Sequence, residues 1–382
     1  MRVAIVHDWL TGMRGGEIVL EAIVDLFPSA ELFTLIHVPG STSPKIEALK
    51  IHTSFLQKIP NVEKNYRYFL PLMPKAIESF DLSGFDLILS SSHCVAKGIR
   101  KPKSAFHASY IHAPMRYIWD RFDDYFGPDR GRPLISTAAR LARPVLQRWD
   151  KNSSRIENVD VLMANSHFIA DRIQEFYGRH AEVVHPFADL SRFKSDPNRT
   201  DDYLIVGAFA PYKRIDLAIE AFNEIKRPLK IIGSGQDEKH LRDIAAENIE
   251  FLGSLSNAEV ARRLSTGKAF IYPGVEDFGI TAVEALASGT PLIAYGAGGA
   301  LDIVADHCGV LFKNQTRPDL IRAVLEFESH PDRWSREACV KRAQHFSRSR
   351  FQREFLNVLL QGLSEKPSHP LLPEIEPLLS QY

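Results

Sequence analysis

The feature that most constrains this chain is a regular alternation of short apolar runs with longer segments of helical apolar spacing. Runs rich in Val, Ile, Leu and Phe are typical of buried strands, and intervening helices allow successive strands to pair in parallel. The sequence therefore predicts an α/β fold built on parallel sheets. The expected strands occupy residues 3–6, 31–36, 86–91, 104–111 and 159–165, and then 203–209, 229–235, 249–255, 269–274 and 291–296.

The expected strands form two sets, one on each side of a polar stretch at residues 194–202. A chain of 382 residues is long enough for two α/β domains. The second set is the more regular, and its spacing is typical of a doubly wound nucleotide-binding domain. Because the tail after residue 365 is rich in proline, we expect no regular helix there. The expected domains are 1–186, 187–345, and a helix with a proline-rich tail at 346–382 that returns to the N-terminal domain.

Composition excludes several classes of function. Basic and acidic side chains balance at 47 each, which argues against nucleic acid as the main partner. Cys94, Cys308 and Cys339 are odd in number, widely separated and without C-x-x-C spacing, so neither a disulfide framework nor a zinc site is supported. The sequence shows no apolar stretch typical of a signal peptide or a spanning helix, so we expect a cytoplasmic protein. Because no D-x-D pair follows a strand and no histidines have metal-ligand spacing, we expect no metal.

The segment at residues 130–155 carries seven basic side chains and is expected to form a basic amphipathic helix interrupted at Pro144. Its apolar residues at helical spacing are Leu134, Ala138, Leu141, Val145 and Trp149. Two interpretations remain open. The helix could dock on the anionic inner face of the cytoplasmic membrane, or its apolar stripe could pack on its own domain, which is the interpretation we favour.

The clearest chemical signal lies where an expected strand runs into a helix, around Gly279. Unpaired backbone N–H groups at a helix start, with a glycine that permits close approach, bind phosphate, so we expect Gly279, Ile280 and Thr281 to hold a diphosphate. Glu284 lies one turn further on, where it can accept hydrogen bonds from ribose hydroxyls. Glu276 precedes the turn and can meet a sugar. The alternative is that both glutamates are ordinary loop and helix-terminal acids.

Glycines and polar side chains also follow strands of the first set. Gly15 and Gly16 precede a helical pattern, so this helix start also admits a phosphate. His112 follows the strand at 104–111, at the carboxyl edge where open α/β sheets bind their ligands. Asp8 follows the first strand and is a weaker candidate for contact with an acceptor.

These motifs resemble the donor-site signature of retaining glycosyltransferase family four. The resemblance rests on Glu276 and Glu284, on Phe278-Gly279-Ile280 between them, and on the segment at 285–304. It continues upstream through residues 206–222, 231–242 and 251–264. The segments HDWLTGMRGGE at 7–17 and YIHAPMRYIWD at 110–120 resemble the acceptor-side motifs of bacterial O-antigen-type mannosyltransferases. The resemblance therefore covers both expected domains.

The resemblance implies a GT-B fold, with two Rossmann-like doubly wound parallel-sheet domains facing each other across a cleft. It implies that Lys213 binds the donor diphosphate, that Glu284 binds the ribose, and that Glu276 binds the transferred sugar. Phe278, Gly279, Ile280 and Thr281 would complete the donor loop, and Gly15 and Gly16 would approach the phosphate. His112 would lie beside the reacting sugar. The family's arginine five residues before the lysine is Ala208 here, and Arg214 is a candidate replacement.

The function implied is a retaining hexosyltransferase with His112, Glu276 and Lys213 as its catalytic residues. The expected donor is GDP-mannose, and the expected acceptor is a cell-surface polysaccharide or a lipid-linked oligosaccharide. Front-face attack would need no cofactor, because the leaving phosphate oxygen takes the acceptor's proton and a lysine stabilises the charge that develops. Another GDP- or UDP-hexose as donor, or a non-catalytic sugar-nucleotide-binding protein, remain alternatives. A dehydrogenase is disfavoured because the G-x-G at 233–235 lacks its third glycine.

Overall fold

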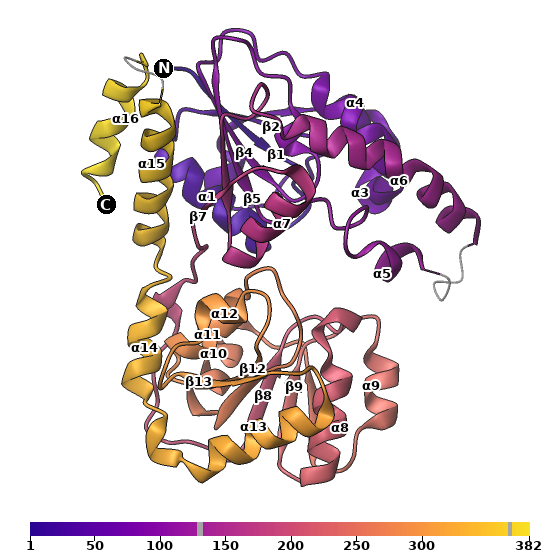
Figure 1. Ribbon diagram of the computed structural model, residues 1–382, viewed down its shortest axis with the longest axis vertical. Coiled ribbons are helices and arrows are strands. Elements are labelled where there is room, and N and C mark those ends of the chain that lie inside the picture. Colours follow the sequence, from indigo (N-terminus) through magenta and orange to yellow (C-terminus); the bar gives the residue numbers. More distant parts are fainter. Residues whose placement is uncertain (128–132, 366–368) are drawn as a thin grey trace. The chain divides into compact units, whose positions relative to one another are not determined.

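The computed structural model describes residues 1–127, 133–365 and 369–382, and the chain divides into two compact units (Figure 1). The N-terminal unit comprises Met1–His185 together with Phe351–Tyr382, and the C-terminal unit comprises Pro186–Arg350. The last segment of the chain therefore belongs to the first unit. Arg130 and Arg132 of the expected basic helix, and Pro367 of the tail, lie outside the described residues.

The N-terminal unit is built on a parallel sheet whose described strands have the order β3-β2-β1-β4-β5-β6-β7. All five residues of β1 are buried, as expected for a strand covered on both faces. The short strands β3 and β7 were not predicted, because each is too short or too polar to give an apolar run. The strands are β1 (Val3–His7), β2 (Glu31–Thr34), β3 (Lys50–Thr53), β4 (Leu87–Ser92), β5 (Phe106–Ile111), β6 (Val161–Ala164) and β7 (Glu182–Val183).

The order of this sheet reverses at β1, which pairs with β2 on one side and with β4 on the other. Loops that leave the carboxyl ends of β1 and β4 diverge at such a switch point, and ligands bind there in open α/β sheets. The helices are α1 (Gly15–Leu26), α2 (Pro44–Glu47), α3 (Val62–Asn65), α4 (Met73–Glu78), α5 (Phe122–Phe126), α6 (Pro133–Ser153), α7 (His167–Tyr177), α15 (Arg348–Ser364) and α16 (Leu372–Leu379).

Helix α6 presents a different face to its own unit from the one we favoured. Leu141 and Val145 are 75 % and 70 % exposed, so the predicted apolar stripe does not pack on the domain along these two residues. The inner face instead carries Leu146 and Arg143, whose guanidinium donates to the carbonyl oxygens of Ile118 and Trp119. Polar anchoring of the inner face, which apolar spacing does not reveal, decides the orientation of the helix.

Helix α16 contradicts the expectation that the proline-rich tail forms no regular helix. Pro373 lies in the first turn, where its missing N–H would have no intrahelical partner, and Pro377 removes one hydrogen bond further along. Ile375 is fully buried, and the amino group of Met1 forms an ion pair with Glu374 at 2.8 Å. Tertiary contacts to the start of the chain therefore stabilise a helix that its sequence disfavours (Figure 1).

Helix α15 packs on the N-terminal sheet. A side chain at Gly362 would place its Cβ 2.1 Å from Val161 Cγ2, so only glycine permits the observed approach of the helix to β6. Gln352 Nε2 donates to the carbonyl oxygen of Ala22 in α1. The ring of Phe351 lies 5.6 Å from that of Tyr110 on β5. These contacts explain why the end of the chain belongs to the N-terminal unit.

The C-terminal unit has a parallel sheet whose described strands have the order β10-β9-β8-β11-β12-β13, with the switch point between β8 and β11. The last strand, β13, was not predicted. The elements are β8 (Tyr203–Val206), α8 (Ile215–Ile225), β9 (Leu229–Ile232), α9 (Glu238–Ile244), β10 (Ile249–Gly253), α10 (Asn257–Thr266), β11 (Ala269–Tyr272), α11 (Ile280–Ala287), β12 (Leu292–Tyr295), α12 (Ala300–Ile303), β13 (Gly309–Phe312), α13 (Arg317–Ser329) and α14 (Arg336–Gln344).

Among the described residues, each unit contains apolar clusters of its own. In the C-terminal unit one cluster includes Phe222 and Leu320, and a second includes Phe270 and Leu286. Among the described residues, no helix is both long enough and apolar enough to cross a bilayer.

A buried ion pair anchors α6 in the N-terminal unit. Lys97 and Asp150 are paired and are 1 % and 0 % exposed, and Asp150 also accepts hydrogen bonds from Trp119 Nε1 and Tyr177 Oη at 2.7 and 2.8 Å. Removing one partner of such a pair leaves an uncompensated buried charge.

We expect Lys97→Met to lower the free energy of unfolding by about 3–5 kcal/mol, because Asp150 would stay buried without its cation. Denaturant unfolding of the full chain measures the change. The matched control is Arg100→Met, which breaks the surface pair with Glu78 and is expected to cost about 0–1 kcal/mol. Equal losses in the two variants would contradict the importance of the buried pair.

Candidate functional site

In the C-terminal unit, the loop from β11 to α11 packs closely against the residues around it, and its glycines make this possible. Gly279, which begins α11, has a φ of 109°, and a Cβ there would lie 2.1 Å from Tyr272 Oη. Both the dihedral angle and the space therefore require glycine. The first N–H groups of α11, at Ile280 and Thr281, have no intrahelical acceptor, which leaves a helix start suited to an anion.

A second glycine turn, after β12, supports this loop and was not singled out from the sequence. Gly299 N donates to the carbonyl oxygen of Glu276 at 2.9 Å, and a Cβ at Gly299 would lie 2.0 Å from the carbonyl oxygen of Phe278. Gly298 has a φ of 64°, and a Cβ there would lie 2.5 Å from the carbonyl oxygen of Glu276. The adjacent glycines of G-A-G-G were the signal available in the sequence, because only glycine allows two backbones this close.

Lys213 and Glu276 form an ion pair in the C-terminal unit, with side chains 17 % and 18 % exposed. Gly274 makes the pair possible, because a Cβ there would lie 2.8 Å from Lys213 Cα. The Lys213 Nζ also lies 3.4 Å from the Cβ position of Gly207, directly after β8. The ends of β8 and β11 thus bring together two of the predicted residues, at the edge where the fold binds ligands.

Glu284 lies one turn into α11, and among the described residues its side-chain carboxyl has no hydrogen-bond or ion-pair partner, while its backbone carbonyl oxygen accepts from Ser288. Burial raises the pKa of its carboxyl, and the negative charge of Asp189 adds to this, while Arg192 opposes it. Without a ligand, a half-buried carboxylate that has no hydrogen-bond donors destabilises the folded protein. Hydroxyl groups of a ligand would supply the missing donors.

Two predicted donor residues have other partners. Arg214 has a left-handed φ of 51°, and its guanidinium donates to Asp216 at 3.1 Å and to Gln315 at 3.4 Å. The side chain of Phe278 is 3 % exposed and packs against Phe346 at 5.4 Å between ring centroids. Phe278 therefore contributes its side chain to the core of the unit.

In the N-terminal unit, the predicted His112 lies at the carboxyl edge of the sheet, beside residues that sequence reasoning missed. Its Nε2 is 2.8 Å from Ser91 Oγ, which is also 3.2 Å from His7 Nδ1. His93 lies nearby, with its ring centroid 6.3 Å from that of His112. The signal available in the sequence was the polar run Ser90 to His93 at the end of the expected strand.

His93 and His112 are kept neutral by burial. Burial lowers the pKa of His112 well below its usual range, and the proximity of His93 and His7 adds to the effect. Burial lowers the pKa of His93 as well, although Asp8 opposes the change. A neutral imidazole at pH 7 can donate a hydrogen bond from one ring nitrogen and accept one at the other, which suits contact with a sugar hydroxyl.

Asp8 has a structural role, which corrects its assignment to the acceptor side. It is fully buried, and its carboxylate accepts four backbone N–H bonds. The donors are His93, Cys94, Val95 and Ala96, at 2.6 to 2.9 Å. Four bonds fill the acceptor capacity of a carboxylate, so none remains for a substrate hydroxyl. Asp8 instead fixes the loop after β4 on the end of β1.

Gly15 and Gly16 begin α1, and Gly16 lies against the histidines. A Cβ at Gly16 would lie 3.7 Å from His7 Cε1 and 3.8 Å from His112 Nε2, which are ordinary contact distances. Packing inside the unit therefore does not require glycine at this position. A ligand that approaches the start of α1 closely would explain why position 16 is a glycine.

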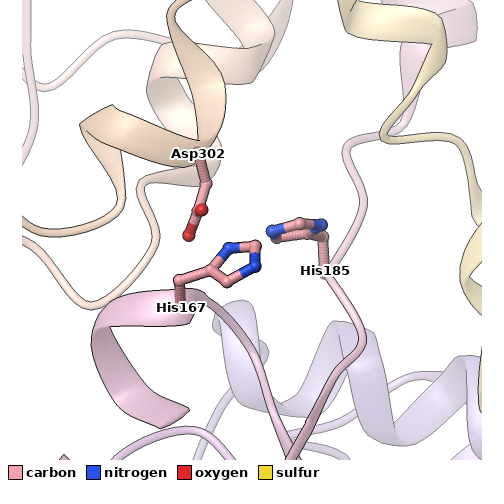
Figure 2. A group of neighbouring side chains, drawn as sticks. All are labelled: His167, His185 and Asp302. Atoms are coloured by element: carbon pink, nitrogen blue, oxygen red, sulfur yellow. The ribbon is translucent and has the colours of Figure 1, made fainter. Parts of the chain in front are cut away.

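Figure 2 shows His167, His185 and Asp302, whose side chains are of types that bind metals. The two histidines belong to the N-terminal unit, with ring centroids 5.7 Å apart, while Asp302 belongs to the C-terminal unit. Two imidazoles are fewer than the three or four protein ligands of a zinc site, so the N-terminal unit by itself does not present one here.

Comparison with known proteins now assigns a family to the C-terminal unit. Residues 188–346 match the model of the family described as glycosyl transferases group 1. These residues form a glycosyl transferases group 1 domain. The loop from β11 to α11, Lys213 and Glu284 all lie within this group 1 domain.

Relatives and solved structures agree with the assignment. The chain is 32 % identical over 178 residues to an uncharacterised glycosyltransferase of Methanocaldococcus jannaschii, covering 44 % of this chain and 50 % of the relative. It is 29 % identical over 207 residues to a GDP-mannose-dependent monoacylated α-(1-6)-phosphatidylinositol monomannoside mannosyltransferase of Corynebacterium glutamicum, covering 46 % and 54 %. The chain thus spans about half the length of these relatives.

The fold also agrees. The lipopolysaccharide outer core galactosyltransferase WaaB superposes with a TM-score of 0.69 at 16 % identity, covering 95 % of this chain and all of that one. The chain with its group 1 domain has the GT-B fold, which confirms the predicted α/β class with two parallel sheets.

Glu284 gives a prediction on stability. A carboxyl whose folded pKa is raised destabilises the fold as the pH rises through the interval between its unfolded and folded pKa values, because the folded state binds the proton more tightly. We therefore expect Glu284→Gln to be more stable than the wild type at pH 7, with the difference disappearing below pH ~4. Denaturant unfolding at several pH values measures it.

The matched control is Glu247→Gln, at an exposed glutamate of the same unit, which should show no such dependence on pH. A loss of stability in Glu284→Gln at pH 7 would mean that the protein itself satisfies the carboxylate.

Proposed function

We propose that this protein is a retaining glycosyltransferase that transfers a hexose from a nucleotide sugar to a saccharide acceptor. The observation that carries the proposal is the arrangement at the carboxyl edge of the C-terminal sheet. There the helix start at Gly279, the Lys213–Glu276 pair and the unpaired Glu284 lie within one group 1 domain. A diphosphate, a sugar and a ribose each have a chemically matched partner among these groups.

The proposed binding mode assigns a role to each residue. The N–H groups of Ile280 and Thr281 would bind the donor diphosphate, and Glu284 would accept hydrogen bonds from the ribose. Lys213 would neutralise the charge that develops on the leaving diphosphate, and Glu276 would bind hydroxyls of the sugar. When donor phosphate competes for Lys213, the ion pair with Glu276 would open and both groups would turn to the ligand.

Front-face attack is the mechanism we propose. Glu276 is held by Lys213, and a carboxylate engaged with a cation is a weak nucleophile, which argues against a covalent sugar intermediate on it. The leaving phosphate oxygen would then accept the acceptor's proton, and the protein would contribute positioning and electrostatic stabilisation. Neutral His112 would hydrogen-bond a sugar hydroxyl. No step in this scheme uses a metal or a cofactor.

Mannose from GDP-mannose is the proposed donor sugar, supported by the named specificity of the Corynebacterium glutamicum relative. The second candidate is another GDP- or UDP-hexose, which the galactosyltransferase among the structural neighbours favours. The proposed acceptor is a cell-surface polysaccharide or a lipid-linked oligosaccharide.

Lys213→Ala tests the proposed chemistry. We expect the kcat of sugar transfer to fall about 10²–10³-fold, because the variant loses charge stabilisation in the transition state. Chromatography of the product formed from the preferred nucleotide sugar, without added metal, measures the rate. Lys239→Ala, at an exposed lysine of the same unit, is the control and should keep full activity.

NMR of the anomeric proton in the product would establish whether the configuration is retained. An inverted product, or turnover that survives in Lys213→Ala, would contradict the mechanism.

We also propose peripheral contact with anionic membrane through the outward face of α6. Leu141 and Val145 are exposed there, and Arg140, Arg148 and Lys151 are exposed around them. The one acidic side chain of the described helix, Asp150, is fully buried in its pair with Lys97. Apolar side chains framed by cations are suited to an anionic bilayer surface.

We expect the protein to float with vesicles that contain phosphatidylglycerol. The double variant Leu141→Ser/Val145→Ser should bind them at least tenfold more weakly, because it loses the two apolar side chains that would be buried in the bilayer. Leu325→Ser, at an exposed leucine of the C-terminal unit, is the control. Equal flotation of all three proteins, or flotation with neutral vesicles alone, would refute this contact.

A further inference from the structure

Three polar side chains lie in a row across the carboxyl edge of the N-terminal sheet. His7 ends β1, Ser91 lies near the end of β4, and His112 follows β5. Because β1 and β4 pair in parallel with His7 opposite Ser91, these two side chains point to the same face of the sheet. His112 N donates to the carbonyl oxygen of Ser92 and continues the pairing of β5 with β4, so its ring lies beside Ser91. The order and register of the strands therefore assemble the row.

The Ser91 hydroxyl links the two imidazole rings. Its Oγ lies 2.8 Å from His112 Nε2 and 3.2 Å from His7 Nδ1, and the residue is fully buried. A hydroxyl carries one proton, so it donates to one of these nitrogens and accepts from an N–H at the other. When both rings are neutral, their tautomers are therefore coupled. A proton on His7 Nδ1 places the His112 proton on Nδ1, and a proton on His7 Nε2 places it on Nε2.

Glu17 favours one of these two states from the far side of His7. Its Oε2 accepts from Arg14 N at 3.0 Å in the first turn of α1, while its Oε1 lies 3.8 Å from His7 Nε2. Among the described residues, this nitrogen has no hydrogen-bond partner. Although burial acts to raise the pKa of the Glu17 carboxyl, the proximity of His7 lowers it overall, so the group is ionised at neutral pH. A buried carboxylate attracts an N–H and repels a lone pair, which favours the His7 proton on Nε2.

We propose that Glu17, His7 and Ser91 are positioning residues that fix the tautomer of His112, with its proton on Nε2 and a lone pair on Nδ1. We name these four residues the histidine relay. Ser91 occupies Nε2 of His112, and among the described residues Nδ1 has no partner, so Nδ1 is the nitrogen left for a ligand. His112 therefore accepts a hydrogen bond from a sugar hydroxyl. The tautomer follows from the geometry of the unit alone, whereas the sugar contact rests on the proposed function.

Nitrogen NMR of the full chain reads the tautomer directly. In protein that contains isotope-labelled histidine, the chemical shifts of the two ring nitrogens show which one carries the proton, and the variant His112→Gln assigns the signals. At pH ~8.5, where an ordinary histidine is neutral, the wild type should show His112 protonated on Nε2. Protonation on Nδ1, or a mixture of the two tautomers, would overturn the proposal.

Glu17→Gln should reverse the tautomer of His112, although the two side chains do not touch. The amide oxygen of glutamine can keep the bond from Arg14 N, which leaves its NH₂ group facing His7 Nε2 as a donor. His7 then carries its proton on Nδ1 and donates to Ser91, whose hydroxyl turns to His112 Nε2. The His112 proton therefore moves to Nδ1. An unchanged tautomer in this variant would overturn the proposal.

Two further variants separate the histidine relay from a general change in packing. Ser91→Ala removes the linking hydroxyl, so Ser91→Ala and Ser91→Ala/Glu17→Gln should show the same tautomer of His112. A tautomer that still follows residue 17 without the hydroxyl would overturn the proposed path. Glu63→Gln, at an exposed glutamate of the same unit, is the control and should leave the tautomer unchanged. If Ser91→Ala fails to fold, the comparison of the wild type with Glu17→Gln still decides the proposal.

Nucleotide-sugar analogues with one hydroxyl replaced at a time test the contact with the sugar. A hydroxyl that donates to His112 is replaced equally badly by hydrogen and by fluorine, so calorimetry with the wild type should show both analogues binding about fivefold more weakly. In Glu17→Gln, where His112 donates instead, the fluorine analogue should recover part of this loss. Full affinity of the wild type for every fluorine analogue would overturn the acceptor role of His112.

Failure of the histidine relay and failure of the proposed function give different results. Reversal of the tautomer in a protein that binds and transfers no sugar would refute the proposed function and leave the relay established. Sugar transfer by a protein whose His112 carries its proton on Nδ1 would refute the relay and leave the transferase.

Discussion

The constraint on which the candidate residues of both units depend is the reversal of strand order in each parallel sheet. At β1 and β4, and again at β8 and β11, neighbouring strands send their following loops in opposite directions, and the space between them collects side chains. In the N-terminal unit Asp8 fixes this geometry by accepting four N–H bonds from the loop after β4. In the C-terminal unit glycine packing has the same effect, since Gly274 and Gly279 admit contacts that any side chain would block.

The carboxyl edges of the two sheets differ in their electrostatics. The N-terminal edge gathers His7, His93 and His112 in a buried setting that keeps His93 and His112 neutral and links two of the rings through Ser91. The C-terminal edge holds a paired lysine and an unpaired, half-buried glutamate, Glu284. The first arrangement favours hydrogen bonds to neutral hydroxyls. The second keeps charged groups ready to exchange a protein partner for a ligand, at a cost in stability that is common in binding sites.

Helix α6 connects fold and surface in the N-terminal unit. Its inner face is held by Asp150 and Arg143, which satisfy buried polar groups, and this leaves Leu141 and Val145 facing outward. These two exposed apolar side chains lie among exposed cations, which is the observation behind the proposed membrane contact.

The sequence by itself determined the fold class and most strands, because apolar periodicity is a local property. It also predicted Lys213, Glu276, Gly279, Glu284 and His112 as site residues, and the structure brings Lys213 and Glu276 together. The sequence did not reveal β3, β7 or β13, which are short strands completed by pairing with neighbours. Only the tertiary structure decided that Asp8 is structural, that α6 turns its apolar pair outward, and that α16 forms despite its prolines. These outcomes depend on hydrogen bonds and packing between residues distant in the chain, which no local pattern encodes.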